Sequence, residues 1–175
     1  MKRKIFNVIS STTPNPNCEA LKDALEVKKG QRKSLGNELK KNNDAKNENQ
    51  ADLKSTKGSL AIENKQKSDL ESLNSKIDAK IQSNKQWLQN HQNASPVVKK
   101  TLRSQNQQLN NAKTANINTI KKLENRKKIR EEAISLLEKE IAQLQKNIDE
   151  INKDITKKDA EIAKLNNQIK EAGCK

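Results

Sequence analysis

Bulky side chains are the first thing that this sequence lacks. Its 175 residues include one Phe, one Trp and no Tyr, and 31% of them are hydrophobic. A chain of this length with so little bulk cannot fill the interior of a compact domain. Glycine and proline are also scarce, with four and three residues, which disfavours sheets and loop-rich folds. We therefore expect either an elongated, all-α molecule or a disordered chain, and the periodicity of the sequence decides between them.

The sequence also has little of what catalysis or metal binding requires. It contains a single histidine, His91, and two cysteines, Cys18 and Cys174. These three residues are too few for a four-ligand metal site. In an elongated molecule with both cysteines at one end, His91 would lie at the opposite end, too far away for a Cys–His nucleophile. A Gly-rich phosphate loop is missing as well. We therefore expect a protein that is not an enzyme and that needs no metal or cofactor.

Long apolar runs are absent. The first residues are basic, but the apolar run that follows, residues 5–9, is short and is interrupted by a polar residue. No segment approaches the roughly 20 apolar residues that a transmembrane helix needs. We therefore expect no transmembrane segment and no recognisable signal peptide.

Apolar residues do recur, with heptad spacing, in two long segments. In residues 21–88, steps of four and three reach twenty positions, and half of these are Leu or Ile. The polar stretch near the middle keeps the phase, because Leu39 and Leu53 lie two heptads apart, so we expect one uninterrupted helix. The second segment keeps its register over residues 102–169, and its pattern is strongest from Ile134 to Ile169. This periodicity favours a coiled coil over disorder.

Each segment carries its own start signal. Asn15 precedes Pro16, and Ser95 precedes Pro96; proline suits the first turn of a helix, and the residue before it can cap that turn. Gly173 is a typical helix stop. The pattern predicts a long antiparallel coiled-coil helical hairpin with two arms, and the main alternative is an association of unbent helices. The expected parts are an extended N-terminal tail (1–15), a first arm (16–92), a turn (93–95), a second arm (96–172) and a C-terminal cap (173–175).

The register of such a hairpin follows from its polar core residues. When residues whose numbers add to 190 face each other, a positions of one arm meet d positions of the other, as an antiparallel pair requires. Two asparagine pairs and one ion pair then lie opposite each other: Asn74 with Asn116, Asn84 with Asn106, and Glu63 with Lys127. Buried asparagines cost stability but fix the register. In the same register Arg32 and Arg130 meet poor partners, so we expect their side chains to extend outward.

The same register brings the two cysteines to one end. Cys18 faces Ala172, so Cys174 lies within reach beyond the end of the second helix. We expect an intramolecular disulfide that closes the base of the hairpin, with two free thiols or intermolecular bridges as the alternatives. A disulfide indicates an oxidising environment, so we expect an extracellular, periplasmic or virion-associated protein.

The net charge of +14 is concentrated near the turn, where residues 99–130 carry ten Lys or Arg residues against one acidic residue. An anionic surface polymer or a nucleic acid would be attracted to such a region, whereas the simpler interpretation is a solvated helix surface. Sequence-specific reading of a nucleic acid is disfavoured, because the basic stretch lies inside the paired arm and no series of aromatic side chains offers a stacking platform. The candidate basic patch is Lys99, Lys100, Arg103, Lys121, Lys122, Arg126, Lys127, Lys128 and Arg130.

The turn carries the candidate contacts for a partner. The only Trp and the only His lie there, and we expect Trp87, His91, Val97 and Val98 to form a contact at the tip; alternatively, these side chains simply close the end of the core. We also expect a homo-oligomer through the strong pattern from Ile134 to Ile169, because the register sets Leu144 and Ile148 of this pattern opposite Lys46 and Asn42 and so leaves it poorly covered.

The sequence therefore favours a non-enzymatic structural or adhesive coiled-coil rod with a basic, partner-contacting tip. Such a rod could be a spacer, a surface appendage, or a subunit of a filament or particle. The alternative is an electrostatic protein that binds nucleic acid or a cell envelope, for example a component of a phage virion.

Overall fold

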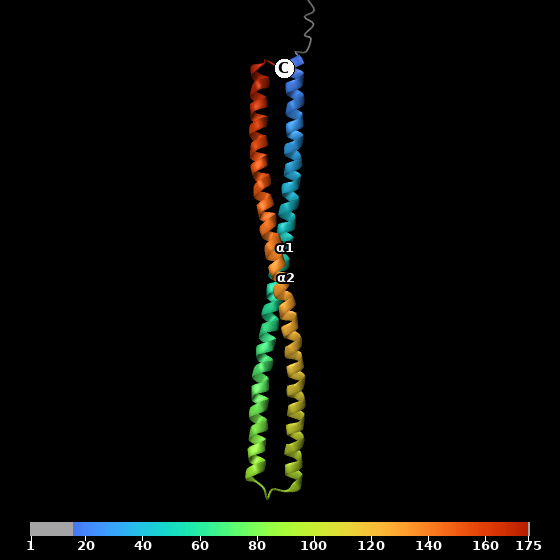
Figure 1. The fold of residues 1–175 in the computed structure, drawn as a ribbon, viewed down its shortest axis with the longest axis vertical. Coiled ribbons are helices and arrows are strands. Elements are labelled where there is room, and N and C mark those ends of the chain that lie inside the picture. The colour runs from blue at the N-terminus through green and yellow to red at the C-terminus, as the bar shows by residue number, and fades with distance from the viewer. Residues whose placement is uncertain (1–15, 175) are drawn as a thin grey trace, which may run out of the picture. The chain divides into compact units, whose positions relative to one another are not determined.

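The computed structural model describes residues 16–174 and consists there of two long helices and a short connection. Helix α1 spans Pro16–Asn90 and helix α2 spans Pro96–Glu171. The two helices pack against each other as a hairpin (Figure 1), which confirms the predicted fold class. The N-terminal tail expected at residues 1–15 lies outside the described residues.

The chain divides into two compact units, and each is described by itself. The base unit contains the described residues up to 47 together with residues 142–174, and the tip unit contains residues 48–141. The connection between α1 and α2, residues 91–95, belongs to the tip unit. It begins two residues before the turn expected from the sequence, because α1 ends at Asn90.

The start of α2 is capped as its sequence predicts. The hydroxyl oxygen of Ser95 accepts a hydrogen bond from the amide of Val98 at 3.4 Å, and the Ser95 carbonyl accepts the first helical hydrogen bond from Lys99 at 3.2 Å. Pro96 occupies the first helical position, where its missing N–H costs no hydrogen bond. These contacts fix the point at which the chain turns back.

The end of α2 is a Schellman motif. Gly173 has a φ of 66°, and the amide of Cys174 donates to the carbonyl of Ile169 at 3.1 Å. The Gly173 amide donates to the carbonyl of Lys170, also at 3.1 Å. Glycine adopts this left-handed conformation without a steric penalty. The motif turns the chain out of the helix immediately before Cys174.

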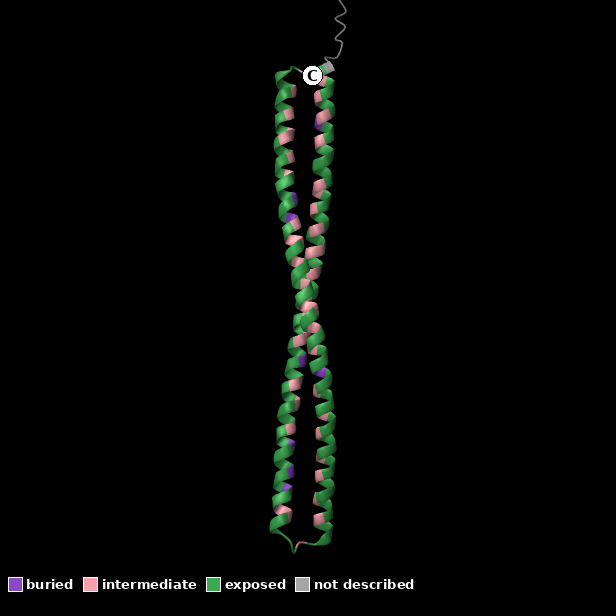
Figure 2. Cartoon of the chain, viewed as in Figure 1, coloured by how far each residue is buried: buried purple, intermediate pink, exposed green. Residues whose placement is uncertain are grey.

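Within each unit, the buried and half-buried residues lie on the sides of α1 and α2 that face each other (Figure 2). Of the twenty core positions predicted for α1, all but Arg32 are buried or half-buried. Two helices cover only a narrow stripe of each other, so the core is thin. Its buried hydrophobic residues are Leu25, Ile77, Ile81, Leu123, Ile148 and Ile151.

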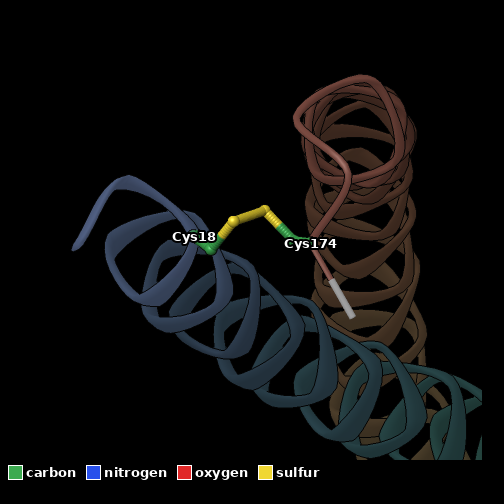
Figure 3. Close-up of a disulfide and its surroundings, with 2 residues drawn as sticks. All are labelled: Cys18 and Cys174. Carbon is green, nitrogen blue, oxygen red and sulfur yellow. A yellow bond between two sulfur atoms is a disulfide. The ribbon is translucent and has the colours of Figure 1, made fainter. Parts of the chain in front are cut away.

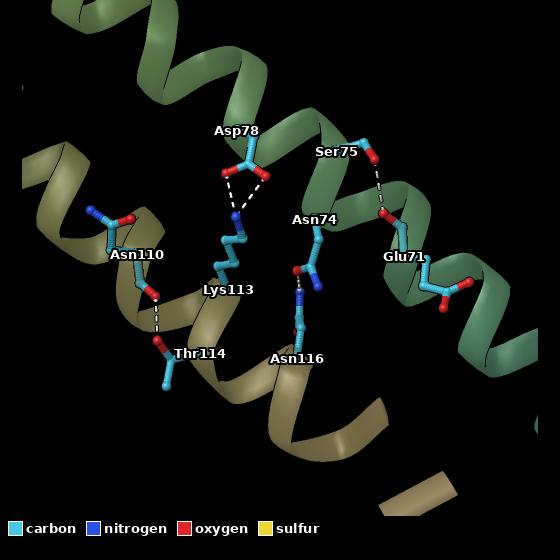
Figure 4. A network of polar contacts seen from close by, with 8 residues as sticks. All are labelled: Glu71, Asn74, Ser75, Asp78, Asn110, Lys113, Thr114 and Asn116. Atoms are coloured by element: carbon cyan, nitrogen blue, oxygen red, sulfur yellow. Dashed lines mark hydrogen bonds and ion pairs between the residues drawn. The ribbon is translucent and has the colours of Figure 1, made fainter. Parts of the chain in front are cut away.

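In the tip unit, asparagine pairs mark the register that the sequence suggests. Asn84 donates its side-chain amide to the Oδ1 of Asn106 at 2.8 Å, and Asn116 donates to the Oδ1 of Asn74 at 2.9 Å. Figure 4 shows the second pair between α1 and α2. Asn84 is only 4% exposed, so its hydrogen bond lies in the core and ties one residue of α1 to one residue of α2.

The expected pairing of Glu63 with Lys127 is wrong. Glu63 is buried and instead accepts two hydrogen bonds from Arg130, at 2.8 and 3.2 Å. A guanidinium group can reach along the partner helix and bind the two oxygens of a carboxylate through two different nitrogen atoms, whereas a lysine has a single ammonium nitrogen. Lys127 lies 3.7 Å from Glu131 of its own helix.

Arg32 extends outward as expected, since it is exposed, and its side chain also has a partner. In the base unit its Nε donates to the Oδ1 of Asp159 at 3.0 Å. The sequence pattern places Arg32 opposite Lys158, but a long side chain can bend to a carboxylate on a neighbouring position.

Candidate functional site

The tip unit contains a pocket beside the connection. Its volume is about 410 Å³. The last turns of α1 and the first turns of α2 form it together, because the hairpin brings these segments to the same level. Three of the four predicted tip contacts, Trp87, Val97 and Val98, line it. Its other lining residues are Lys80, Ser83, Asn84, Thr101 and Leu102.

The fourth predicted contact, His91, holds the indole in place. The rings of His91 and Trp87 stack with centroids 4.4 Å apart and planes 9° apart. The Nδ1 and backbone amide of His91 both lie 3.0 Å from the Trp87 carbonyl oxygen, which accepts a hydrogen bond from the amide. Trp87 is half-buried, whereas Val97 is 73% exposed. The pocket therefore presents apolar side chains to solvent next to the only lysine of its lining.

The predicted basic residues are not gathered on one surface. By heptad position, Lys121 and Lys128 point to one side of the hairpin, while Lys122 and Arg126 point to the other. All four are exposed, and none of them forms a direct ion pair with a carboxylate within the tip unit. The tip unit thus carries positive charge around its circumference.

Several other charges of the tip unit are neutralised by cross-helix pairs. Lys67 lies 2.8 Å from Glu124, and this hydrogen bond holds the pKa of Glu124 below its ordinary value. The charges of Lys127 and Lys121 lower that pKa further. The same pair raises the pKa of Lys67.

These cross-helix pairs distinguish two sides of the tip unit. With Ile81 at a and Asn84 at d, the carboxylates of Asp78, Glu124 and Glu138 occupy e positions, which lie on one side of an antiparallel pair. Their partners are Lys113 at 2.6 Å, Lys67 at 2.8 Å and Lys57 at 2.8 Å. Figure 4 shows the Asp78–Lys113 pair. We call this the bridged side.

The opposite side, at the g and c positions, carries exposed hydrophobic residues, and we call it the apolar side. Sequence reasoning missed it, although the register alone assigns these residues to one side. Within residues 48–141, a cross-helix hydrogen bond on this side runs from the side-chain amide of Asn49 to the carboxylate of Glu140, at 3.2 Å. It lies at the end of the unit remote from the connection. The hydrophobic residues are Ile62, Leu73, Ile129 and Leu136.

The base unit holds the predicted disulfide between Cys18 and Cys174 (Figure 3). Their Cα atoms are 5.5 Å apart, within the usual range for a disulfide, and the bond joins residues separated by 156 positions. The Schellman motif of α2 directs Cys174 toward α1. The bond confirms the predicted closure of the base.

A second cross-link of the base unit is electrostatic. The carboxylate of Glu161 lies 2.8 Å from the Nζ of Lys28 and 3.0 Å from that of Lys158. Hydrogen bonds from Lys28 and Lys158 lower the pKa of Glu161 to about 2. The hydrogen bond to Glu161 also raises the pKa of Lys28.

The stripe from Ile134 to Ile169 is the core-facing side of α2. None of its apolar core positions is exposed, and Ile148 and Ile151 are 6% and 7% exposed. The two positions expected to be poorly covered are Leu144 and Ile148; Leu144 is half-buried and Ile148 is buried, so poor coverage is not supported there. Self-association itself stays a prediction.

Metal-binding groups and membrane-spanning helices are two further features for which the sequence makes a prediction. Residues 16–174 contain no group of three or more His, Cys, Asp or Glu side chains arranged to hold a metal ion. Neither helix of that part of the chain includes a stretch long and apolar enough to cross a membrane.

Comparisons with known proteins give no relative. The sequence matches no family model, and it has no significant similarity to a curated protein or to a solved structure. The function must therefore be argued from the geometry of the two units.

Proposed function

We propose that this chain is a non-enzymatic structural or adhesive hairpin whose tip unit contacts a partner. The observation that carries this proposal is the pocket of Trp87, Val97 and Val98 at the connection. Tryptophan is one of the residues that most often anchor protein interfaces. The stacked His91 supports the same role, because it restrains the indole before a partner arrives.

The base unit fits the role of an attachment end. Its disulfide and the ion pair of Lys28 with Glu161 hold α1 and α2 together at the ends remote from the connection. A disulfide of this kind is typical of oxidising environments, so we propose an extracellular, periplasmic or virion-associated location. In such a location the chain would act as a spacer, a surface appendage, or a subunit of a filament or particle.

Imaging of native material tests this role. In negative-stain electron microscopy of the protein from its natural source, we expect it within surface appendages, filaments or particles. Its recovery solely as dispersed, unassembled molecules without attachment to any surface would contradict the structural role.

A second candidate function is supported by the charge of the tip unit. Lys121, Lys122 and Lys128 are exposed, and within the tip unit they form no direct ion pair with a carboxylate. Such residues can bind an anionic surface polymer or a nucleic acid through its phosphates, without base contacts. In this case the chain would be an electrostatic binder of nucleic acid or of an envelope.

Binding to a random-sequence DNA duplex and to a polyphosphate separates the two candidates. For an electrostatic binder, affinity falls steeply with salt, and reversal of Lys121, Lys122, Lys127 and Lys128 to Glu abolishes binding. The matched control reverses Lys153, Lys157 and Lys164 of the base unit and should have little effect. Equal losses from both sets would indicate diffuse basicity and would count against the second candidate.

A separate substitution tests whether the tip pocket is the contact. Once a partner is found, Trp87→Ala should weaken the complex at all salt concentrations if the pocket is an anchor. Binding that depends on salt and is indifferent to Trp87→Ala would exclude the pocket as the contact.

A further inference from the structure

Four of the exposed hydrophobic residues of the tip helices lie on one side of the unit. Ile62, Ile129 and Leu136 are 60%, 65% and 60% exposed, and all three occupy c positions. Leu73 occupies a g position, next to c around the helix. Because g and c positions of both helices lie on the same side of an antiparallel pair, these residues share the apolar side.

The apolar side also carries a groove. Its volume is about 400 Å³, and Leu70 and the buried Leu123 lie among its lining residues. Asp69 lies at its edge with Gln66 and Thr119. The bridged side of the same unit is spanned by lysine–carboxylate pairs instead. The two sides therefore differ in chemistry, and one of them leaves apolar side chains uncovered.

We propose that the apolar side of the tip unit binds a second copy of this chain, with the two hairpins parallel and related by a two-fold axis along their length. This inference does not depend on the partner proposed at the connection. In this arrangement, α1 of one copy faces α2 of the other at the same level. Which residues of α1 and α2 lie at the same height along the hairpin is fixed by the asparagine pairs.

The register makes this contact self-complementary. Ile62 lies level with Ile129, so each Ile62 meets Ile129 of the second copy. One heptad nearer the connection, Asp69 lies level with Lys122, so each Asp69 meets Lys122 of the second copy. Both charged residues are exposed and have no ion-pair partner within residues 48–141. A two-fold axis produces each contact twice.

The antiparallel alternative fits poorly. With the two copies reversed and centred on the isoleucines, α1 would face α1 and α2 would face α2. Lys122 would then lie against Leu136 of the second copy, and Asp69 would meet Ser55. Charge complementarity therefore favours the parallel arrangement.

The contact is small. A stable interface usually buries about 800 Å² per partner with 20 to 30 residues on each side, and the apolar side offers four large hydrophobic residues per copy. We therefore expect a weak dimer whose population rises with protein concentration. At the level of the isoleucines, the small g-position residues Ser59 and Ala133 allow the helices of the two copies to approach closely.

Sedimentation equilibrium over a concentration series tests the interface. The disulfide-bonded wild-type chain should show a monomer–dimer equilibrium, and Ile129→Asp should leave only monomer. The matched control is Ile117→Asp, an exposed isoleucine on the bridged side of α2, which should leave the dimer unchanged. Circular dichroism melting of each variant establishes that the hairpin is still folded.

A charge exchange tests the parallel register. Asp69→Lys and Lys122→Asp should each raise the dimer dissociation constant about ten-fold, through lost attraction and new repulsion at two symmetric contacts. The double variant should recover the wild-type value, whereas Lys121→Asp, on the bridged side, should have little effect. The proposal would be overturned if the wild type were monomeric or if the double variant failed to recover the wild-type dissociation constant. It would also be overturned if Ile148→Asn dissociated the dimer and Ile129→Asp did not.

Discussion

The buried pair of Asn84 and Asn106 allows a quantitative test of how the core is held in register. Asn84 is 4% exposed and donates to Asn106 across the hairpin at 2.8 Å. Substitution of Asn106 by alanine removes this bond and leaves a buried amide without a partner. A lost hydrogen bond costs about 1 kcal/mol, and a buried unsatisfied group costs about 1 to 3 kcal/mol. We therefore expect Asn106→Ala to lower the free energy of unfolding by about 3 kcal/mol.

The partner substitution should cost less. Asn84→Ala also removes the bond, but the amide that it leaves, on Asn106, is only half-buried and can be hydrated. We expect a loss of about 2 kcal/mol. The double alanine variant leaves no unsatisfied amide, so its loss should be smaller than the sum of the two single losses. The double variant should therefore lose about 1 kcal/mol, the hydrogen bond alone, and the expected coupling is about 4 kcal/mol.

Urea unfolding followed by tryptophan fluorescence measures these losses. Trp87 is the only tryptophan and lies one helical turn from Asn84, so its emission reports on this part of the tip unit. Additive single losses would refute the reasoning, because they would mean that the two amides do not depend on each other. The variant with leucine at both positions should be at least as stable as the wild type, because it removes the buried amides and adds apolar contact.

Two further predictions concern the base unit. Reduction of the disulfide, or replacement of Cys18 and Cys174 by Ser, should lower the free energy of unfolding by about 5 kcal/mol, the value that the chain-entropy model gives for a separation of 156 residues. Non-reducing mass spectrometry should find the bond within one chain. An unchanged urea midpoint on reduction would contradict the predicted stabilisation. Glu161 has a pKa of about 2, below the ordinary 4.5, so its stabilising contribution is present above pH 4.5 and is lost as the pH falls toward 2. When the melting temperature is measured as the pH is lowered over that interval, it should fall less steeply in Glu161→Gln than in the wild type. Equal slopes would show that the Lys28 and Lys158 contacts do not stabilise the fold.

Much of the fold follows from the sequence because its signals are local or periodic. The proline after a capping residue marks the start of α2, and Gly173 marks its end. The hairpin register follows from matching like residues, since amides at Asn74 and Asn116 can satisfy each other only when they face. These features depend on backbone geometry and on spacing, which a single sequence records directly.

The contacts of long side chains could not be predicted in the same way. Glu63 has two basic residues within reach, and spacing alone favours Lys127, whereas the bidentate geometry of Arg130 decides the pairing. The apolar side is a different case. Its residues can be assigned from the register, but their exposure depends on which side the cross-helix ion pairs occupy, and that depends on how Lys67 and Lys113 bend.

The position of the disulfide also has a mechanical consequence. If a load is applied to the chain on the outer flanks of Cys18 and Cys174, the two helices of a hairpin without a cross-link would separate one turn after another, since each step breaks only a few contacts. With the bridge in place, the covalent bond between the two sulfur atoms carries the load, and the 155 residues between the cysteines stay out of the force path. Reduction would therefore change the response to tension from a fixed link to an extensible one, and would release the length stored in α1 and α2.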